Sequence, residues 1–268
     1  MERVAIGDLS IAFERRGAGS PLVLLHGGLS DHREWRPQLE GLAGEFQIIA
    51  WDAPGCGGST DPPDTFRMPQ YADVLAGFIE ALGVVRPHVV GLSWGSALAL
   101  ELYRRCPALP RTLVLASAYA GWAGSLPSEE VAERLRDMLG MLARRPHDVA
   151  RSFAPSLFTE RAPAAIVEEA EAIMSGFRRS GSEPMLRAIA EADLRDVLPA
   201  IGVPTLLLYG EEDERAPAAV ARAMHGAIRG STLVTLPAAG HQSNLEAAER
   251  FNDAVRHFLT EREEPPDA

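Results

Sequence analysis

The amino-acid sequence predicts an α/β fold: a mostly parallel sheet of about eight strands with helices on both faces and an inserted helical cap. Strand-like runs alternate with helical patterns along most of the 268 residues. The strand-like runs are continuously apolar, which is typical of parallel strands buried on both faces. One long stretch, residues 121–196, interrupts the alternation with helical patterns alone.

The first half of the chain begins with a hairpin signal. Gly7-Asp8 separates two short runs, so residues 4–6 and 9–14 are expected to pair antiparallel at one edge of the sheet. From there the apolar runs and the helical spacing of large apolar residues alternate regularly. The other strands expected in this half are residues 21–26, 47–52, 88–92 and 111–116, and the expected helices are residues 31–43, 69–82 and 94–105.

The alternation resumes after residue 196. Strands are expected at residues 204–209 and 232–236, and helices at residues 217–225 and 246–259. Active sites of open parallel sheets lie at the carboxyl ends of the strands, so helices inserted there would cover the site. The expected division is therefore a core of residues 1–120 and 197–268 and a helical cap, or lid, of residues 121–196.

Composition limits the classes of partner and location. The net charge of −11, with 46% hydrophobic and 24% charged residues, is typical of a soluble globular protein and argues against nucleic acid or an anionic membrane as a partner. We expect Cys56 and Cys106 to be free thiols and the acidic tail, residues 261–267, to fray. Neither a signal peptide nor an apolar stretch of about 20 residues is visible, which favours a cytoplasmic location. The protein is expected to be a monomer or homodimer.

The strongest chemical signal is Gly91-Leu92-Ser93-Trp94-Gly95, between an expected strand and an expected helix. This G-x-S-x-G pattern is typical of a nucleophile elbow, in which the serine sits on a tight, strained strand-to-helix turn. Larger residues two positions on either side of Ser93 would clash. The helix that starts there directs backbone N–H groups toward the reacting oxygen. Ser93 is therefore the candidate nucleophile.

A serine hydroxyl needs a base to take its proton, and His241 is the best candidate. It follows the expected strand 232–236 and Gly240, and it precedes Ser243-Asn244-Leu245-Glu246, whose spacing predicts a capping box for the last helix. His241 therefore lies on a loop between a strand and a helix start. The other six histidines fall in the first Gly turn, on expected helices or at a strand start.

The acid that orients His241 should lie between the serine and the histidine in the chain. Four carboxylates follow the expected strand 204–209, and Asp213 is preferred for its offset from Gly210 and its place before the turn at Pro217. The competing acids in this run are Glu211, Glu212 and Glu214. Such a run is otherwise typical of a solvated face.

Two backbone donors are needed to bind the oxyanion of a tetrahedral intermediate. One is expected to be the N–H of Trp94, which follows the nucleophile. The other is expected from the turn His26-Gly27-Gly28-Leu29, with Gly28 preferred and Leu29 as the alternative. Such chemistry requires no metal and no organic cofactor.

Together these motifs resemble the α/β-hydrolase superfamily over nearly the whole chain. The matching segments are His26-Gly27, the Gly-rich run from Asp52 to Ser59, residues 91–95, Gly210 to Asp213, and Gly240-His241. The resemblance implies that His26 is structural and that Asp52 shapes a loop near the site without a catalytic role. Epoxide hydrolases and haloalkane dehalogenases place an aspartate where Ser93 stands, so the resemblance is to the serine branch.

Within that superfamily, residues 239–246 followed by Phe251-Asn252 resemble the 3-oxoadipate enol-lactonases. That resemblance implies hydrolysis of an enol-lactone and a small helical cap. Ser93-Trp94-Gly95-Ser96 is also similar to the proline iminopeptidases. Those enzymes show His-Gly-Gly-Pro-Gly, whereas here Gly28 is followed by Leu29-Ser30, which disfavours a peptidase.

Apolar and aromatic side chains near the expected cap are candidates for the substrate pocket. The residues we expect to line it are Leu29, Trp122, Met138, Phe153 and Phe177. Trp35 and Tyr119 are further candidates of the same kind.

The sequence therefore predicts a serine hydrolase that cleaves a carboxylic ester or lactone of a small molecule through an acyl-enzyme, with Ser93, Asp213 and His241 as its triad. Two alternatives remain open. The same triad could serve C–C bond hydrolysis, prolyl amide cleavage, or a lyase or cyclisation step. The scaffold could also act as a small-molecule receptor.

Overall fold

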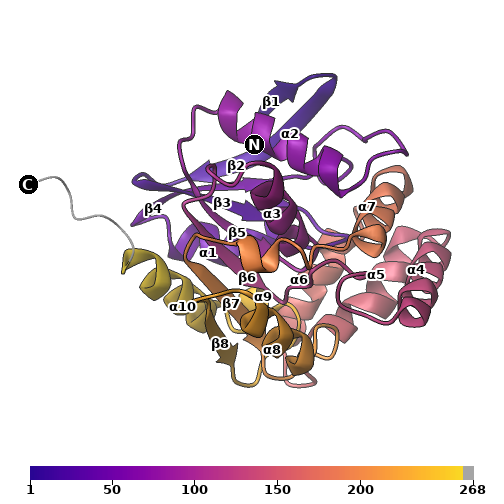
Figure 1. Cartoon of the computed structure of the whole chain (residues 1–268). Helices are drawn as coiled ribbons and strands as arrows, with labels where there is room; N and C mark the ends of the chain where they lie inside the picture. Colours follow the sequence, from indigo (N-terminus) through magenta and orange to yellow (C-terminus); the bar gives the residue numbers. More distant parts are fainter. Residues whose placement is uncertain (262–268) are drawn as a thin grey trace, which may run out of the picture.

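Eight strands form one sheet in the order β1-β2-β4-β3-β5-β6-β7-β8 in the computed structural model, which describes residues 1–261 (Figure 1). The strands are β1 (Glu2–Ile6), β2 (Leu9–Arg16), β3 (Ser20–Leu25), β4 (Phe46–Trp51), β5 (His88–Leu92), β6 (Thr112–Ala116), β7 (Thr205–Gly210) and β8 (Thr232–Leu236). The expected α/β fold is confirmed. The acidic tail expected to fray lies, from residue 262 onward, outside the described residues.

Antiparallel pairing is confined to the amino-terminal edge of the sheet. β1 pairs antiparallel with β2, and β2 pairs antiparallel with β4. All other neighbours are parallel. Gly7, at a φ of +56°, supplies the left-handed residue of the hairpin turn between β1 and β2.

The parallel strands are apolar on both faces because each face carries its own helices. In β3, Val23 and Leu25 join one hydrophobic cluster, whereas Leu22 and Leu24 join the other. The first cluster contains side chains of α2 (Met68–Ala81), α3 (Trp94–Arg105) and α8 (Ala218–Ala227). The second contains side chains of η1 (His32–Trp35), α1 (Arg36–Gly41) and α10 (Ala248–Thr260). The continuous apolar runs in the sequence follow from this two-sided burial.

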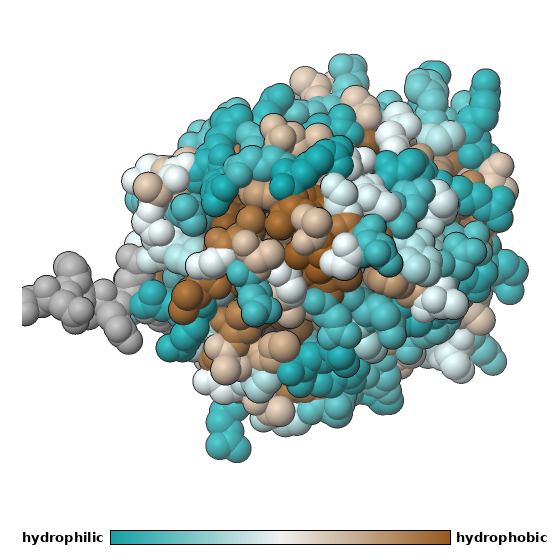
Figure 2. Space-filling view, turned by 90° about the horizontal axis from the view of Figure 1, so that it is seen from above, coloured by the Kyte–Doolittle hydropathy of each residue, from teal (hydrophilic) through white to brown (hydrophobic). Residues whose placement is uncertain are grey.

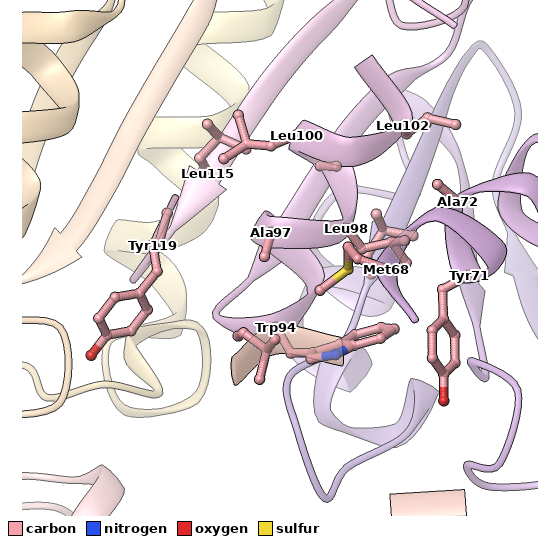
Figure 3. Close-up of a cluster of buried hydrophobic side chains, with 14 of the residues drawn as sticks. Met68, Tyr71, Ala72, Trp94, Ala97, Leu98, Leu100, Leu102, Leu115 and Tyr119 are labelled. Carbon is pink, nitrogen blue, oxygen red and sulfur yellow. The ribbon is translucent and has the colours of Figure 1, made fainter. Parts of the chain in front are cut away.

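Trp94, the first residue of α3, belongs to the first cluster. Figure 3 shows its ring beside Tyr71 of α2, and the two ring centroids lie 5.0 Å apart at an interplanar angle of 85°. Such an edge-to-face contact is favoured by the quadrupoles of aromatic rings. The Trp94 indole N–H also donates to the Met185 carbonyl oxygen at 3.1 Å. The start of α3 is thereby fixed on two sides.

Helices alone fill the segment between β6 and β7. We call α4 (Ser128–Leu142), α5 (Pro146–Phe153), α6 (Ala164–Met174) and α7 (Arg179–Glu191) the inserted helices. Short 3-10 turns, η2 (Ala154–Leu157) and η3 (Leu198–Ala200), also lie in this segment. α4 packs against α7 and α5 against α6, and α4 and α5 lie together at the right of Figure 1.

The inserted helices meet the core where two glycines touch. Gly55, at a φ of +89°, follows β4, and Gly181 lies in α7. A Cβ atom on Gly181 would lie 2.0 Å from the Gly55 carbonyl oxygen. Only two residues without side chains allow this approach of backbones.

The capping box predicted at Ser243–Glu246 is wrong. These residues form a separate short helix, α9 (Ser243–Glu246), whose N-cap Gln242 makes no side-chain cap, and α10 begins two residues later. The Ser243 hydroxyl caps nothing and is buried without a hydrogen-bond partner among the described residues. Glu246 serves a different purpose, described with the site.

The surface mixes apolar and hydrophilic residues. Seen from above, apolar residues gather near the middle of the face and hydrophilic residues surround them (Figure 2).

Between residues 1 and 261, none of the helices combines the length and apolar character needed to cross a bilayer. Cys56 and Cys106 are free thiols, as expected.

Replacement of Gly181 tests the contact between the inserted helices and the core. The added methyl of Gly181→Ala must push α7 from the Gly55 loop, so we expect the free energy of unfolding to fall by about 1–3 kcal/mol. Urea denaturation measures it. Gly226→Ala in α8 is the matched control, because a Cβ atom there meets nothing within 4 Å. That control should be as stable as the wild-type protein or more so; equal stability of both variants would contradict the contact.

Candidate active site

Ser93 sits on the turn between β5 and α3, as the elbow motif predicts. Its backbone has a φ of +52° and a ψ of −109°, a conformation that costs free energy for a residue with a side chain. The Ser93 amide donates to the Ala116 carbonyl oxygen at 2.8 Å, which ties the turn to the end of β6. The Ser96 hydroxyl lies 2.5 Å from the Gly91 carbonyl oxygen and 2.9 Å from that of Ala116. The strained turn is therefore held from both strands.

The two glycines of the elbow are required by space. A Cβ atom on Gly91 would lie 2.4 Å from the Gly95 backbone, and one on Gly95 would lie 2.1 Å from the Leu25 carbonyl oxygen. These distances are far below van der Waals contact. Glycine at both positions lets the first turn of α3 approach the ends of β3 and β5.

His241 and Asp213 form a buried pair. The imidazole Nδ1 lies 2.9 Å from Asp213 Oδ2 and 3.0 Å from Oδ1. Only 6% of His241 and 5% of Asp213 are exposed, so solvent barely screens this contact. Because Nδ1–H donates to the carboxylate, Nε2 is the nitrogen left to accept a proton.

The Asp213 carboxylate is held in its charged form. Its Oδ1 accepts the backbone N–H of Arg215 at 2.9 Å and of Ala216 at 2.8 Å. Burial alone would raise the pKa of Asp213, but the His241 ring and the Ala216 amide help to outweigh it, and the pKa is lowered. Its rivals Glu211, Glu212 and Glu214 are all exposed.

The loop that carries His241 is anchored to β6 and to the inserted segment. The Ser117 hydroxyl donates to the His241 carbonyl oxygen at 2.9 Å. Glu246 accepts the Gly240 N–H at 2.7 Å and the Thr159 N–H at 3.0 Å. One carboxylate thus binds the histidine loop and the segment between α5 and α6 together, which is the role of Glu246 in place of helix capping.

The turn after β3 brings a second set of backbone amides to the site. His26 Nδ1 donates to the Gly27 carbonyl oxygen at 2.7 Å, and Nε2 accepts the Ala53 N–H at 3.0 Å. Burial lowers the pKa of His26, which favours this neutral, bridging ring. The Gly27 N–H is already bound to Glu34 Oε1 at 2.7 Å. The Gly28 and Leu29 amides therefore remain as candidate oxyanion donors.

One cavity collects most of these groups. Its volume is about 60 Å³, room for only a few water molecules. Gly28, Ser93, Trp94 and His241 all line it, which brings the proposed nucleophile, base and oxyanion donors to one place. Asp213 lies behind His241, bound to its far nitrogen.

The expected pocket residues divide between two places. Trp122, Met138 and Phe153 line the cavity with Ser93. Leu29 and Phe177 instead line a separate crevice beside Cys56. Leu29 has a φ of +59°, and its side chain is buried in the first hydrophobic cluster. The expectation that Leu29 and Phe177 face the substrate therefore does not match the structure.

Several cavity residues are absent from the sequence prediction. They are Gly27, Leu92, Arg134, Leu157, Leu186, Ile189, Arg215 and Gln242. Tyr119, which the sequence suggested as a further candidate together with Trp35, also lines the cavity. For two of them, the spacing to a residue already predicted for the site could have indicated their place. Arg134 lies one helical turn before Met138, and Arg215 lies two residues after Asp213.

Asp31, His32 and Asp52 form the one group within residues 1–261 whose ligand atoms lie close enough for a metal ion. Each already has partners. Asp52 accepts His32 Nδ1 at 2.7 Å and the Gly58 N–H at 2.7 Å, and Asp31 binds the Arg33 guanidinium at 2.7 Å. We interpret the cluster as a set of hydrogen bonds that holds the Gly-rich loop after β4 in place.

Comparison with known proteins shows which family the chain matches and which proteins it resembles. The model of the Alpha/beta hydrolase family matches residues 22–254. A thermophilic esterase from Thermogutta terrifontis, solved with malate bound, is similar with a TM-score of 0.90 and 30% identity, covering 98% of this chain and 99% of that one. The enol-lactonase of Burkholderia xenovorans LB400 is similar with a TM-score of 0.85 and 26% identity, over 97% of this chain and all of that one. A Klebsiella pneumoniae protein whose name describes it as a carbamate hydrolase, RutD, is 29% identical over 90% of this chain and 92% of its own.

The titration of Glu34 provides a test of the turn after β3. Burial raises the pKa of Glu34 from its ordinary value of 4.5 to about 8. Hydrogen bonds from Ser30 and Gly27 lower this pKa but do not outweigh burial. The unfolded chain releases this proton near pH 4.5 and the folded chain near pH 8, so the free energy of unfolding should fall as pH rises between these values. Glu34→Gln has the same shape and cannot ionise, and we expect a smaller loss of stability across that window. Urea midpoints measured at several pH values check it; parallel curves for the two proteins would contradict it.

Proposed function

Because the chain belongs to the alpha/beta hydrolase family, we propose that it is a serine hydrolase that cleaves a carboxylic ester or lactone of a small molecule through an acyl-enzyme. The observation that carries the proposal is the cavity that Ser93 and His241 line together, with Asp213 bound to the far side of the imidazole. Relatives named as an esterase and as an enol-lactonase support the substrate class.

The proposed first step is attack of Ser93 Oγ on the carbonyl carbon. His241 takes the hydroxyl proton at Nε2 while Asp213 holds Nδ1–H and stabilises the imidazolium. The carboxylate is suited to this role because its lowered pKa keeps it charged. His241 then gives the proton to the leaving oxygen, and the acyl group stays on Ser93.

The negative oxygen that forms in this step would be bound by backbone amides. Trp94 is the first residue of α3, so its N–H has no partner within the helix. We assign the second donor to Gly28, because the neighbouring Gly27 N–H is bound to Glu34. Both assigned residues line the cavity.

Water completes the proposed cycle. It attacks the acyl carbon with His241 again as the base, the acid is released, and Ser93 regains its proton. None of these steps calls for a metal or an organic cofactor. A cytoplasmic location, with a small molecule as partner and the protein as a monomer or homodimer, remains part of this proposal.

The inserted helices are proposed to act as the cap of the site. The division is a core of residues 1–120 and 197–268 and a cap of residues 121–196. Trp122, Met138 and Phe153 of the proposed cap line the same cavity as Ser93, which supports a role in substrate choice. The carboxylate of Glu246 would hold the cap and the histidine loop in a fixed position relative to each other.

Release of an amino-terminal residue from a peptide fits the cavity less well. An aminopeptidase needs a carboxylate to hold the free amine of its substrate. Among the described residues, the cavity lining includes neither aspartate nor glutamate, whereas it includes Arg134 and Arg215. The charge of the cavity therefore favours an ester or lactone over a peptide with a free amine.

Loss of the Ser93 hydroxyl is the direct test of the nucleophile. We expect Ser93→Ala to lower hydrolysis of p-nitrophenyl butyrate by at least about a thousandfold and to abolish labelling by an alkyl fluorophosphonate. Ser152→Ala, at a serine on the outer side of α5 whose hydroxyl bonds its own helix, should label and turn over like the wild-type protein. Undiminished labelling of the Ser93→Ala protein would overturn the assignment.

A further inference from the structure

Two arginine side chains line the cavity together with Ser93. Arg134 comes from α4 of the inserted helices, and Arg215 follows Asp213 on the loop after β7. Both also line a neighbouring surface groove, so they stand where the cavity meets solvent. The proposed hydrolysis uses neither of them.

The charge of Asp213 acts on the Arg215 guanidinium, but none of the described carboxylates forms an ion pair with it. Within residues 1–261 its side chain forms neither an ion pair nor a hydrogen bond, although its backbone N–H binds Asp213. The guanidinium lies 4.6 Å from the centre of the Phe153 ring, which supports one face of the planar group. Burial and the nearby charge of Arg134 lower the pKa of Arg215, and they outweigh Tyr119 and Asp213, which act in the opposite direction. A half-buried cation beside a like charge is held at a cost in free energy that a bound anion would remove.

Arg134 is held by aromatic rings at the same place. Its guanidinium lies 5.4 Å from the centre of the Trp122 ring and 5.8 Å from that of Tyr119. One nitrogen donates to the Tyr119 hydroxyl at 3.1 Å, and another lies 3.2 Å from Glu130. Glu130 is 46% exposed, so this ion pair is weakened by solvent and leaves much of the positive charge of Arg134 uncompensated.

The surrounding charges do not offer Arg215 another partner. Glu133 and Asp137 line the surface groove but not the cavity. Asp213 is engaged by His241 and two backbone amides, and Glu212 binds Arg161. In a chain of net charge −11, a cavity with two arginines and no carboxylate in its described lining favours an anion electrostatically.

We propose that Arg134 and Arg215 bind a free carboxylate of the substrate, so that the ester or lactone cleaved at Ser93 is a derivative of a dicarboxylic acid. This inference rests on the proposed function for the reacting bond, but the anion site itself does not. Guanidinium groups present parallel N–H donors that match the two oxygens of a carboxylate. The aromatic rings of Trp122, Tyr119 and Phe153, which lie beside the two guanidinium groups, offer flat surfaces to this planar anion.

Binding of a matched pair of esters tests the proposal without turnover. Monomethyl glutarate and dimethyl glutarate differ by one methyl group and one negative charge, and Ser93→Ala protein can be titrated with each by NMR. We expect the monoester to bind about tenfold more tightly or better. Arg215→Gln in the same background should abolish that preference, and Arg134→Gln should reduce it.

Arg136→Gln is the matched control, because Arg136 is an exposed arginine on the same helix as Arg134 and should leave the preference unchanged. Equal affinity for the two esters in the Ser93→Ala protein, or a preference retained in both cavity variants, would overturn the proposal. The two arginine variants are independent, so loss of folding in one leaves the other as the test.

Turnover separates this inference from the proposed function. Protein with Ser93 intact should hydrolyse monomethyl glutarate with a higher kcat/KM than dimethyl glutarate, and Arg215→Gln should lower that ratio by about tenfold. Failure to cleave any ester, with the binding preference present, would count against the hydrolase proposal and leave the anion site supported. Cleavage of both esters with equal kcat/KM and equal binding would do the reverse.

Discussion

The site depends on a place where three backbones come closer than side chains allow. β3, β5 and the first turn of α3 meet at Gly91 and Gly95, where a Cβ atom would lie within 2.4 Å of a neighbouring backbone. This approach forces Ser93 into a left-handed conformation, which is strained for serine. The hydrogen bond from the Ser93 amide to Ala116 and the hydrogen bonds of the Ser96 hydroxyl stabilise this strained conformation. The rest of the fold positions groups around this one turn.

The groups proposed to work with Ser93 arrive on loops that are tied to one another. Asp213 and His241 come after β7 and β8. Each loop is held by a hydrogen bond from outside it: the Glu212 N–H donates to the Ala239 carbonyl oxygen, and the Ser117 hydroxyl donates to that of His241. Glu246 extends that network to the inserted helices, and Glu34 extends it to the Gly27-Gly28 turn. Since the inserted helices, the histidine loop and the Gly27-Gly28 turn are bound by these buried or half-buried carboxyl groups, a change in one should affect the others.

Local sequence patterns predict those parts of the molecule that depend on neighbours in the chain. The antiparallel hairpin at the edge of the sheet, the elbow and the choice of Asp213 over three glutamates follow from turn chemistry and position after a strand. The capping box at Ser243 failed because Glu246 is taken by Gly240 and Thr159, a partner 87 residues away. Leu29 and Phe177 lie outside the cavity because packing directs their side chains elsewhere. Arg134 and Arg215 meet only through the tertiary fold, so no spacing in the sequence marks them as a pair.

The central claim is that the reaction passes through an ester of Ser93, and rapid quenching followed by peptide mass mapping tests it most directly. Protein mixed with a p-nitrophenyl ester and quenched in acid within the first turnover should carry the mass of the acyl group on the peptide that contains Gly91 to Gly95. The adduct should disappear as the substrate is exhausted, since water releases it. Hydrolysis that proceeds with no adduct, or with the acyl group on another peptide, would contradict the account.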